Sequence, residues 1–138
     1  MLLVKGTSNT TDQQQKDKTK LVIRDSTGKA IEQAISIEDD GNFIAIANVE
    51  EVKGDVLLEL KTEGAAFESI YVKEEDVESS FVKNKVIEIN PIVSGASYTI
   101  NDILFETNSS KIIESSKLVI NGFANWLKEN KSVKVEIQ

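Results

Sequence analysis

Short apolar stretches separated by glycine-containing turns run through residues 20–90, and this layout most limits the folds open to the chain. Several stretches alternate apolar and polar residues with the period of two of a half-buried β-strand. Each turn holds a Gly that is free to adopt positive φ. Such a layout is typical of a β-sandwich. The predicted strands are residues 20–24, 34–38, 43–47, 55–62, 67–73 and 85–90, with turns at 25–29, 39–42, 52–55 and 63–66.

Residues 55–62 show the alternation most clearly. One side of this strand is predicted to face a core and the other side mostly water. Residues 2–8 can supply a further strand, which makes about seven in an antiparallel β-sandwich. Polar residues 9–20 lack periodicity and predict a mobile loop. The core-facing set of residues 55–62 is Val56, Leu58 and Leu60, and the opposite set is Leu57, Glu59 and Lys61.

Pro91 is the only proline and marks a change of pattern. Proline cannot continue a central strand, and it pushes the residue before it into an extended conformation. We therefore predict a β-sandwich domain over residues 1–91, a linker over 92–97 and a second unit over 98–138. The second unit has the pattern strand, helix, strand, so the whole chain is expected to be α+β.

Residues 114–129 have the spacing of an amphipathic helix. Gly122 lies in its middle and costs about 1 kcal/mol relative to Ala. Trp126 lies at the edge of the apolar stripe, where core packing is favoured over a role as an exposed sugar-stacking residue. The predicted stripe consists of Ser116, Ile120, Phe123 and Leu127, widened by Val119, Ala124 and Trp126.

In residues 132–138, Val133, Val135 and Ile137 alternate with polar residues, which predicts a final strand. A strand edge with nothing to cover it is prone to association. This strand would complete only a truncated βαβ unit. We therefore expect residues 98–138 to be loosely packed, domain-swapped or self-associating, and the chain to be a fragment of a longer protein.

The net charge of −7 comes from 23 acidic and 16 basic residues, with no basic stripe. Nucleic-acid binding needs clustered Lys and Arg, so no nucleic-acid partner is expected. No apolar run approaches the roughly 18 residues of a membrane-spanning helix. Residues 1–6 are too few for the apolar core of a signal peptide.

The chain contains no His and no Cys, which removes the commonest general base and all thiol chemistry. Without a histidine base, the serines at 109, 110, 115 and 116 are interpreted as turn and helix-start residues. We expect no enzyme activity, no catalytic residue, no cofactor and no metal site.

Two acidic clusters, at residues 38–40 and 74–76, are the remaining candidates for ligand binding. The first leads into a glycine turn and has the ligand type for weak calcium binding, but its spacing matches no EF-hand loop. Turn chemistry is the favoured interpretation.

Residues 96–138 resemble the first half of the OmpA-like C-terminal domain, by which outer-membrane proteins and lipoproteins of Gram-negative bacteria hold peptidoglycan. The family has a strand that ends in Phe and an acidic residue, a Ser-containing turn, a helix and an Ile-Glu-Ile strand. The matching residues are Phe105, Glu106, Asn108, Ser109, Ile112, Ser116, Ile120, Leu127, Val135, Glu136 and Ile137.

The upstream region is similar to carboxypeptidase-regulatory-like, transthyretin-like β-sandwich domains, through DDGNFIAI at 39–46 and EGAAF at 63–67. In Bacteroidetes such a sandwich often directly precedes an OmpA-like domain. Ala66 departs from the pattern, because an aromatic residue often follows the Gly there. The polar segment NTTDQQQK also departs from it, because it replaces the usual compact first turn. The resemblance implies an Ig/transthyretin-like sandwich followed by an incomplete OmpA-like domain.

The resemblance also implies a periplasmic, outer-membrane-associated protein whose full-length form anchors the outer membrane to peptidoglycan. The family binds diaminopimelate with an Asp after a Gly-His-Thr-Asp turn and an Arg in a later helix, both of which would lie beyond Gln138. No residue of this chain is therefore assigned to ligand binding, and the chain alone is not expected to bind peptidoglycan. The alternative is a complete small secreted or surface β-sandwich that binds protein or carbohydrate.

Overall fold

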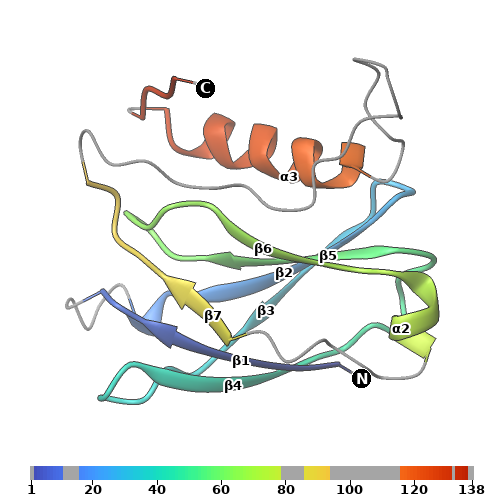
Figure 1. The fold of residues 1–138 in the computed structure, drawn as a ribbon, viewed down its shortest axis with the longest axis horizontal. Coiled ribbons are helices and arrows are strands. Elements are labelled where there is room, and N and C mark those ends of the chain that lie inside the picture. Colours follow the sequence, from blue (N-terminus) through green and yellow to red (C-terminus); the bar gives the residue numbers. More distant parts are fainter. Residues whose placement is uncertain (1, 11–15, 79–85, 94–115, 132, 137–138) are drawn as a thin grey trace.

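The structure is a computed structural model that describes residues 2–10, 16–78, 86–93, 116–131 and 133–136. They form an α+β arrangement of two β-sheets and few helices (Figure 1). The three-stranded sheet has the order β4-β1-β7, and the four-stranded sheet has the order β3-β2-β5-β6. The elements are β1 (Leu2–Ser8), β2 (Lys20–Asp25), β3 (Ala30–Ala34), β4 (Asn42–Ala47), β5 (Val56–Lys61), β6 (Glu68–Val72), α2 (Glu74–Glu78), β7 (Val86–Ile89) and α3 (Ser116–Glu129).

Every strand pair in the described residues except one is antiparallel. In the four-stranded sheet β2 lies antiparallel to β3 and β5, and β5 lies antiparallel to β6. In the three-stranded sheet β1 lies antiparallel to β4 but parallel to β7. The prediction of purely antiparallel pairing is therefore wrong for β7. Parallel neighbouring strands need a long connection. β1 and β7 are the first and last strands of the β-rich region, so the chain between them is long enough for β7 to run in the same direction as β1.

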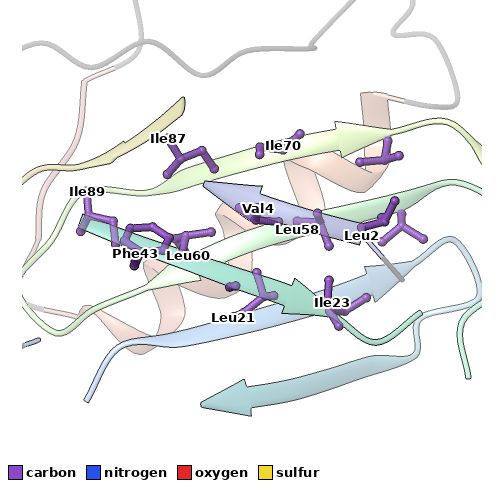
Figure 2. Close-up of a cluster of buried hydrophobic side chains, with 14 of the residues drawn as sticks. Leu2, Val4, Leu21, Ile23, Phe43, Leu58, Leu60, Ile70, Ile87 and Ile89 are labelled. Carbon is purple, nitrogen blue, oxygen red and sulfur yellow. The ribbon is translucent and has the colours of Figure 1, made fainter. Parts of the chain in front are cut away.

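The inward-facing residues of both sheets form one apolar core (Figure 2). Along β5, Val56, Leu58 and Leu60 point into it, as the alternation of the sequence predicts. Burying one Leu or Ile contributes about 1.5–3 kcal/mol, so this core is the main stabilising feature of the β-rich region. Its largest fully buried side chains are Leu2, Leu21, Ile23, Leu58, Leu60, Ile87 and Ile89.

The four predicted glycine turns are confirmed. Gly41 shows why glycine is needed, because Ser8 donates its backbone N–H to the Gly41 carbonyl at 2.7 Å. A Cβ on Gly41 would lie 2.5 Å from the Ser8 carbonyl oxygen. The turn glycines are Gly28 (φ 91°), Gly41 (91°), Gly54 (76°) and Gly64 (80°).

The predicted strand at 34–38 is wrong, because the third strand is Ala30–Ala34 instead. The tight turn at Gly28 brings Ala30 directly opposite Arg24, so pairing with β2 begins at once. Ile35 and Ile37 alternate as a strand would, but they lie outside the strands and pack as half-buried residues against the core. The other predicted strands within residues 1–91 fall within two residues of the observed bounds.

The described ends of the polar segment 9–20 are packed against the sheets. Thr10 and Thr19 are buried, and the hydroxyls of Thr19 and Thr62 lie 2.7 Å apart. Lys16 donates from Nζ to the Asp39 carbonyl at 3.3 Å. These ends therefore contact the rest of the protein, while the mobility of the loop stays a prediction, and residues 11–15 lie outside the described residues.

Only part of the predicted strand–helix–strand unit is described. The helix is confirmed as α3, while the predicted strand at 98–106 and residues 114 and 115 lie outside the described residues. Residues 133–136 are not in a strand. They have no neighbouring strand in the described part of the chain, and Val133 instead donates its N–H to Asn130 and packs with the helix.

Candidate functional site

Helix α3 lies on the outward side of the four-stranded sheet (Figure 1). The outward residues of β5, Leu57, Glu59 and Lys61, define what we call the helix-covered face. Leu57 and Glu59 are only 0% and 1% exposed, so the prediction that this side faces mostly water is wrong. The reason is α3, which comes from a distant part of the sequence and forms a second apolar cluster with the sheet.

Three aromatic rings fill this second cluster. Phe67 packs edge-on against Phe123 and Trp126, with ring centroids 5.4 Å and 6.4 Å apart. The rings of Phe123 and Trp126 stack at 5.8 Å. Such pairs add about 0.5–1.5 kcal/mol to the burial of their area. Trp126 is buried, which confirms its predicted role in core packing.

Gly122 allows α3 to approach the sheet closely. A Cβ at this position would lie 2.7 Å from Cδ2 of Leu57, closer than real Cβ contacts allow. The glycine therefore has a packing role that offsets its poor helix propensity. The sequence shows that Gly122 lowers the stability of the helix, but it does not show that close packing against the sheet requires a glycine there.

The buried stripe of α3 is rotated relative to the prediction. Leu118, which the prediction omitted, is buried, and Ala124, which it included, is exposed. The closest approach at Gly122 sets which residues face the sheet. The buried residues are Ser116, Leu118, Val119, Gly122 and Trp126, while Ile120, Phe123 and Leu127 are half-buried.

A buried ion pair lies on the helix-covered face. Arg24 Nε on β2 is 3.1 Å from Glu59 Oε2 on β5. The other oxygen, Glu59 Oε1, has no hydrogen-bond partner among the described residues. Burial raises the pKa of the Glu59 carboxyl, while the charge and hydrogen bond of Arg24 oppose this shift.

A second ion pair ties α3 to the same strand. Lys61 Nζ lies 2.5 Å from Glu129 Oε2 at the end of the helix. Both side chains are partly solvated, at 29% and 41% exposure. The Glu129 charge further raises the pKa of Glu59, and the Lys61 charge lowers it. The two ion pairs are therefore electrostatically linked.

An acidic hollow of about 470 Å³ lies beside α2. Asp55 is already engaged there, because it accepts hydrogen bonds from the Tyr71 hydroxyl and, at 2.8 Å, from the Glu74 backbone N–H. The predicted acidic cluster at 74–76 thus forms the first turn of α2. The lining residues are Asp55, Tyr71, Lys73, Glu74, Glu75 and Glu78.

The other predicted acidic cluster, at 38–40, builds the turn into β4. Asp40 accepts hydrogen bonds from Asn42 through Oδ1 and Oδ2 at 2.9 and 3.0 Å. Gly41 closes the turn by donating its N–H to the Glu38 carbonyl. The turn interpretation is confirmed. No set of three or more potential metal ligands comes together in the part of the chain that the structure describes.

Asp25 joins two turns through its carboxylate. Its Oδ1 accepts hydrogen bonds from Thr27 and from the Lys29 backbone, and its Oδ2 accepts one from the Lys53 backbone at 3.1 Å. Burial acts to raise the pKa of this carboxyl, but the hydrogen bonds outweigh burial and lower it. This anchor lies in a predicted turn, although the link to Lys53 is not visible in the sequence.

The outward side of the three-stranded sheet carries apolar residues on β1 and β4, and no helix of the described residues covers them. Leu3 is 48% exposed, Ile44 is 65% exposed and Ile46 is 53% exposed. Leu3 lies opposite Ile46, and Lys5 lies opposite Ile44. We call these four residues the exposed face.

The remaining sequence candidates do not form a reactive group among the described residues. Ser116 is buried in the first turn of α3, while the serines at 109, 110 and 115 lie outside the described residues. No helix in the described segments is long and apolar enough to span a bilayer. The chain matches no family model, no curated protein and no solved structure.

Proposed function

We propose that the chain is a non-enzymatic part of a periplasmic, outer-membrane-associated protein whose longer form anchors the outer membrane to peptidoglycan. The resemblance of residues 96–138 to the OmpA-like domain is the basis of this proposal. The observation that carries it is α3, Ser116–Glu129, which forms a helix where the resemblance requires one. The chain needs no cofactor for this role.

In this proposal the β-rich region is an Ig/transthyretin-like sandwich that supports the start of the binding unit. Two sheets that share one core support the sandwich. The close approach of Gly122 to Leu57 supports a fixed position of α3 on the four-stranded sheet. The boundary at 92–97 and the incomplete domain at 98–138 remain part of the proposal.

Cosedimentation with purified peptidoglycan sacculi tests the role. The chain of residues 1–138 is expected to show no saturable cosedimentation, because the family's Asp and Arg match none of its residues. A longer in-frame product of the same gene that adds the Gly-His-Thr-Asp turn and the later helix is expected to cosediment and to be competed by diaminopimelate. Competed binding by residues 1–138 alone, or no binding by the longer product, would overturn the proposal.

A small β-sandwich interaction module is the second candidate. The exposed Leu3, Ile44 and Ile46 favour it, because contiguous apolar surface marks binding sites on soluble proteins. A stop codon directly after codon 138 would favour this candidate over the anchoring function.

A further inference from the structure

The exposed face differs in charge from the rest of the protein. The chain has a net charge of −7, yet the strands of the three-stranded sheet contain only one cation, Lys5, and one anion, Glu88. An apolar area with few charges on an acidic protein is suited to contact with another molecule, because little charge has to be desolvated there.

Lys5 lies within this apolar area. It is exposed and pairs across the strands with Ile44. None of the ion pairs in the described part of the chain includes Lys5. A partner that covers the apolar residues and supplies a carboxylate would complement this charge.

The edge of β4 is poorly suited to strand addition. Glu38 donates its N–H to the Asn42 carbonyl at 3.0 Å, and the Asn42 N–H donates to Asp40. Farther along β4, Gln33 Nε2 donates to the Ile46 carbonyl at 2.5 Å. These bonds occupy both ends of the edge, so a partner has better access to the face than to the edge.

The opposite sheet shows what kind of partner fits. There α3 covers Leu57 on the central strand β5, and its Glu129 pairs with Lys61 on the same strand. The exposed face repeats this chemistry on the central strand β1, with Leu3 and Lys5. A helix is about 10 Å wide, which matches two strands spaced about 4.8 Å apart, and Leu3, Ile44 and Ile46 lie on two neighbouring strands.

We infer that the exposed face docks an amphipathic helix of a protein partner. The apolar stripe of that helix covers Leu3, Ile44 and Ile46, and an acidic side chain beside the stripe pairs with Lys5. This inference does not depend on peptidoglycan anchoring.

The test uses the full chain, labelled with ¹⁵N, and two synthetic stapled helical peptides as probes. Both peptides present the same leucine stripe, one with Glu beside it and the other with Lys. The Glu peptide is expected to give saturable NMR shifts at the amides of Leu3, Lys5 and Ile44. The Lys peptide is expected to bind roughly tenfold more weakly, because it places like charges together.

The variant Lys5→Glu is expected to reverse this preference, since the site is exposed and the change leaves the core intact. Lys128→Glu, an exposed site on α3, is the matched control and is expected to keep the preference for the Glu peptide. Equal affinities for the two peptides, shifts confined to other surfaces, or no saturable shift would overturn the inference. Dimerisation of the chain through the exposed face in sedimentation equilibrium would also overturn it.

Discussion

Leu57 and Leu3 are both outward-facing leucines on central strands, yet Leu57 is 0% exposed and Leu3 is 48% exposed. Each strand also carries an outward lysine. Lys61, on the same strand as Leu57, pairs with Glu129 of α3, whereas no ion pair among the described residues includes Lys5, which is two residues from Leu3. The same residue types on the outward side of a central strand are therefore buried and paired on one sheet but exposed on the other. The second layer, which comes from elsewhere in the chain, decides whether an outward residue belongs to a core.

Replacing each leucine by alanine tests this contrast most strongly. Leu57→Ala removes a buried side chain between β5 and α3 and is expected to lower the free energy of unfolding by about 2–5 kcal/mol. Leu3→Ala is expected to change it by less than about 0.5 kcal/mol, because the side chain is half solvated. Urea unfolding followed by circular dichroism measures both. Equal losses in the two variants would contradict the proposed difference between the faces.

Filling the close contact at Gly122 is expected to have the next largest effect. Gly122→Val places side-chain atoms against Leu57, and overpacking of this kind costs about 1–3 kcal/mol. The neighbouring Asn121→Val is the matched control, because Asn121 is exposed on the same helix and has a helix propensity close to that of Val. Thermal unfolding of both variants compares a Val placed against Leu57 with a Val on the exposed side of the same helix. A Gly122→Val protein as stable as the control would show that α3 can shift without loss.

Much of the β-rich region could be predicted because its signals are local. The alternation of Val56, Leu58 and Leu60 predicts which side of β5 faces the core, and the turn glycines predict where strands end. The error at β3 has a local cause as well. Ile35 and Ile37 alternate like a strand, but the tight turn at Gly28 starts the pairing earlier.

The helix-covered face could not be predicted in the same way, because its signals lie far apart in the sequence. Glu59 follows the pattern of a solvent-facing strand residue, yet it is buried on the side of the sheet against which α3 packs. In the sequence alone, Gly122 only lowers the helix propensity, and its packing role becomes visible only from its contact with Leu57. The acidic cluster at 38–40 was easier to predict, since the hydrogen bonds that form its turn are between nearby residues.

The buried Glu59 is expected to give the helix-covered face its own pH dependence. Burial raises the pKa of this carboxyl, so the folded chain holds a proton at pH values where the unfolded chain has lost it. Its contribution to stability is therefore fully present below the unfolded pKa and is lost as the pH rises through the folded pKa. Glu59→Gln is expected to remove this decline, as measured by urea unfolding across a pH series.

Glu32→Gln is the matched control for Glu59. Glu32 lies on the same sheet and its side chain is half exposed, so this variant replaces a Glu of the sheet without removing a buried carboxyl. Asp25 contributes with the opposite sign, because its pKa is lowered and its stabilisation is lost as the pH falls through that value. If Glu59→Gln changed the free energy of unfolding by the same amount at every pH, the raised pKa of the Glu59 carboxyl would be ruled out as a source of pH dependence.

The ion pair between Lys61 and Glu129 is expected to have the smallest effect. Partly solvated pairs are usually worth about 0.2–1 kcal/mol, so Glu129→Gln is expected to cost no more than this, and less at high salt. Because the Glu129 charge raises the pKa of Glu59, the same change is also expected to move the pH dependence of Glu59 to lower pH. A double-mutant cycle with Lys61→Gln measures the pair itself. Lys5→Gln on the exposed face is the control and is expected to leave stability and its salt dependence unchanged, since none of the ion pairs among the described residues includes Lys5.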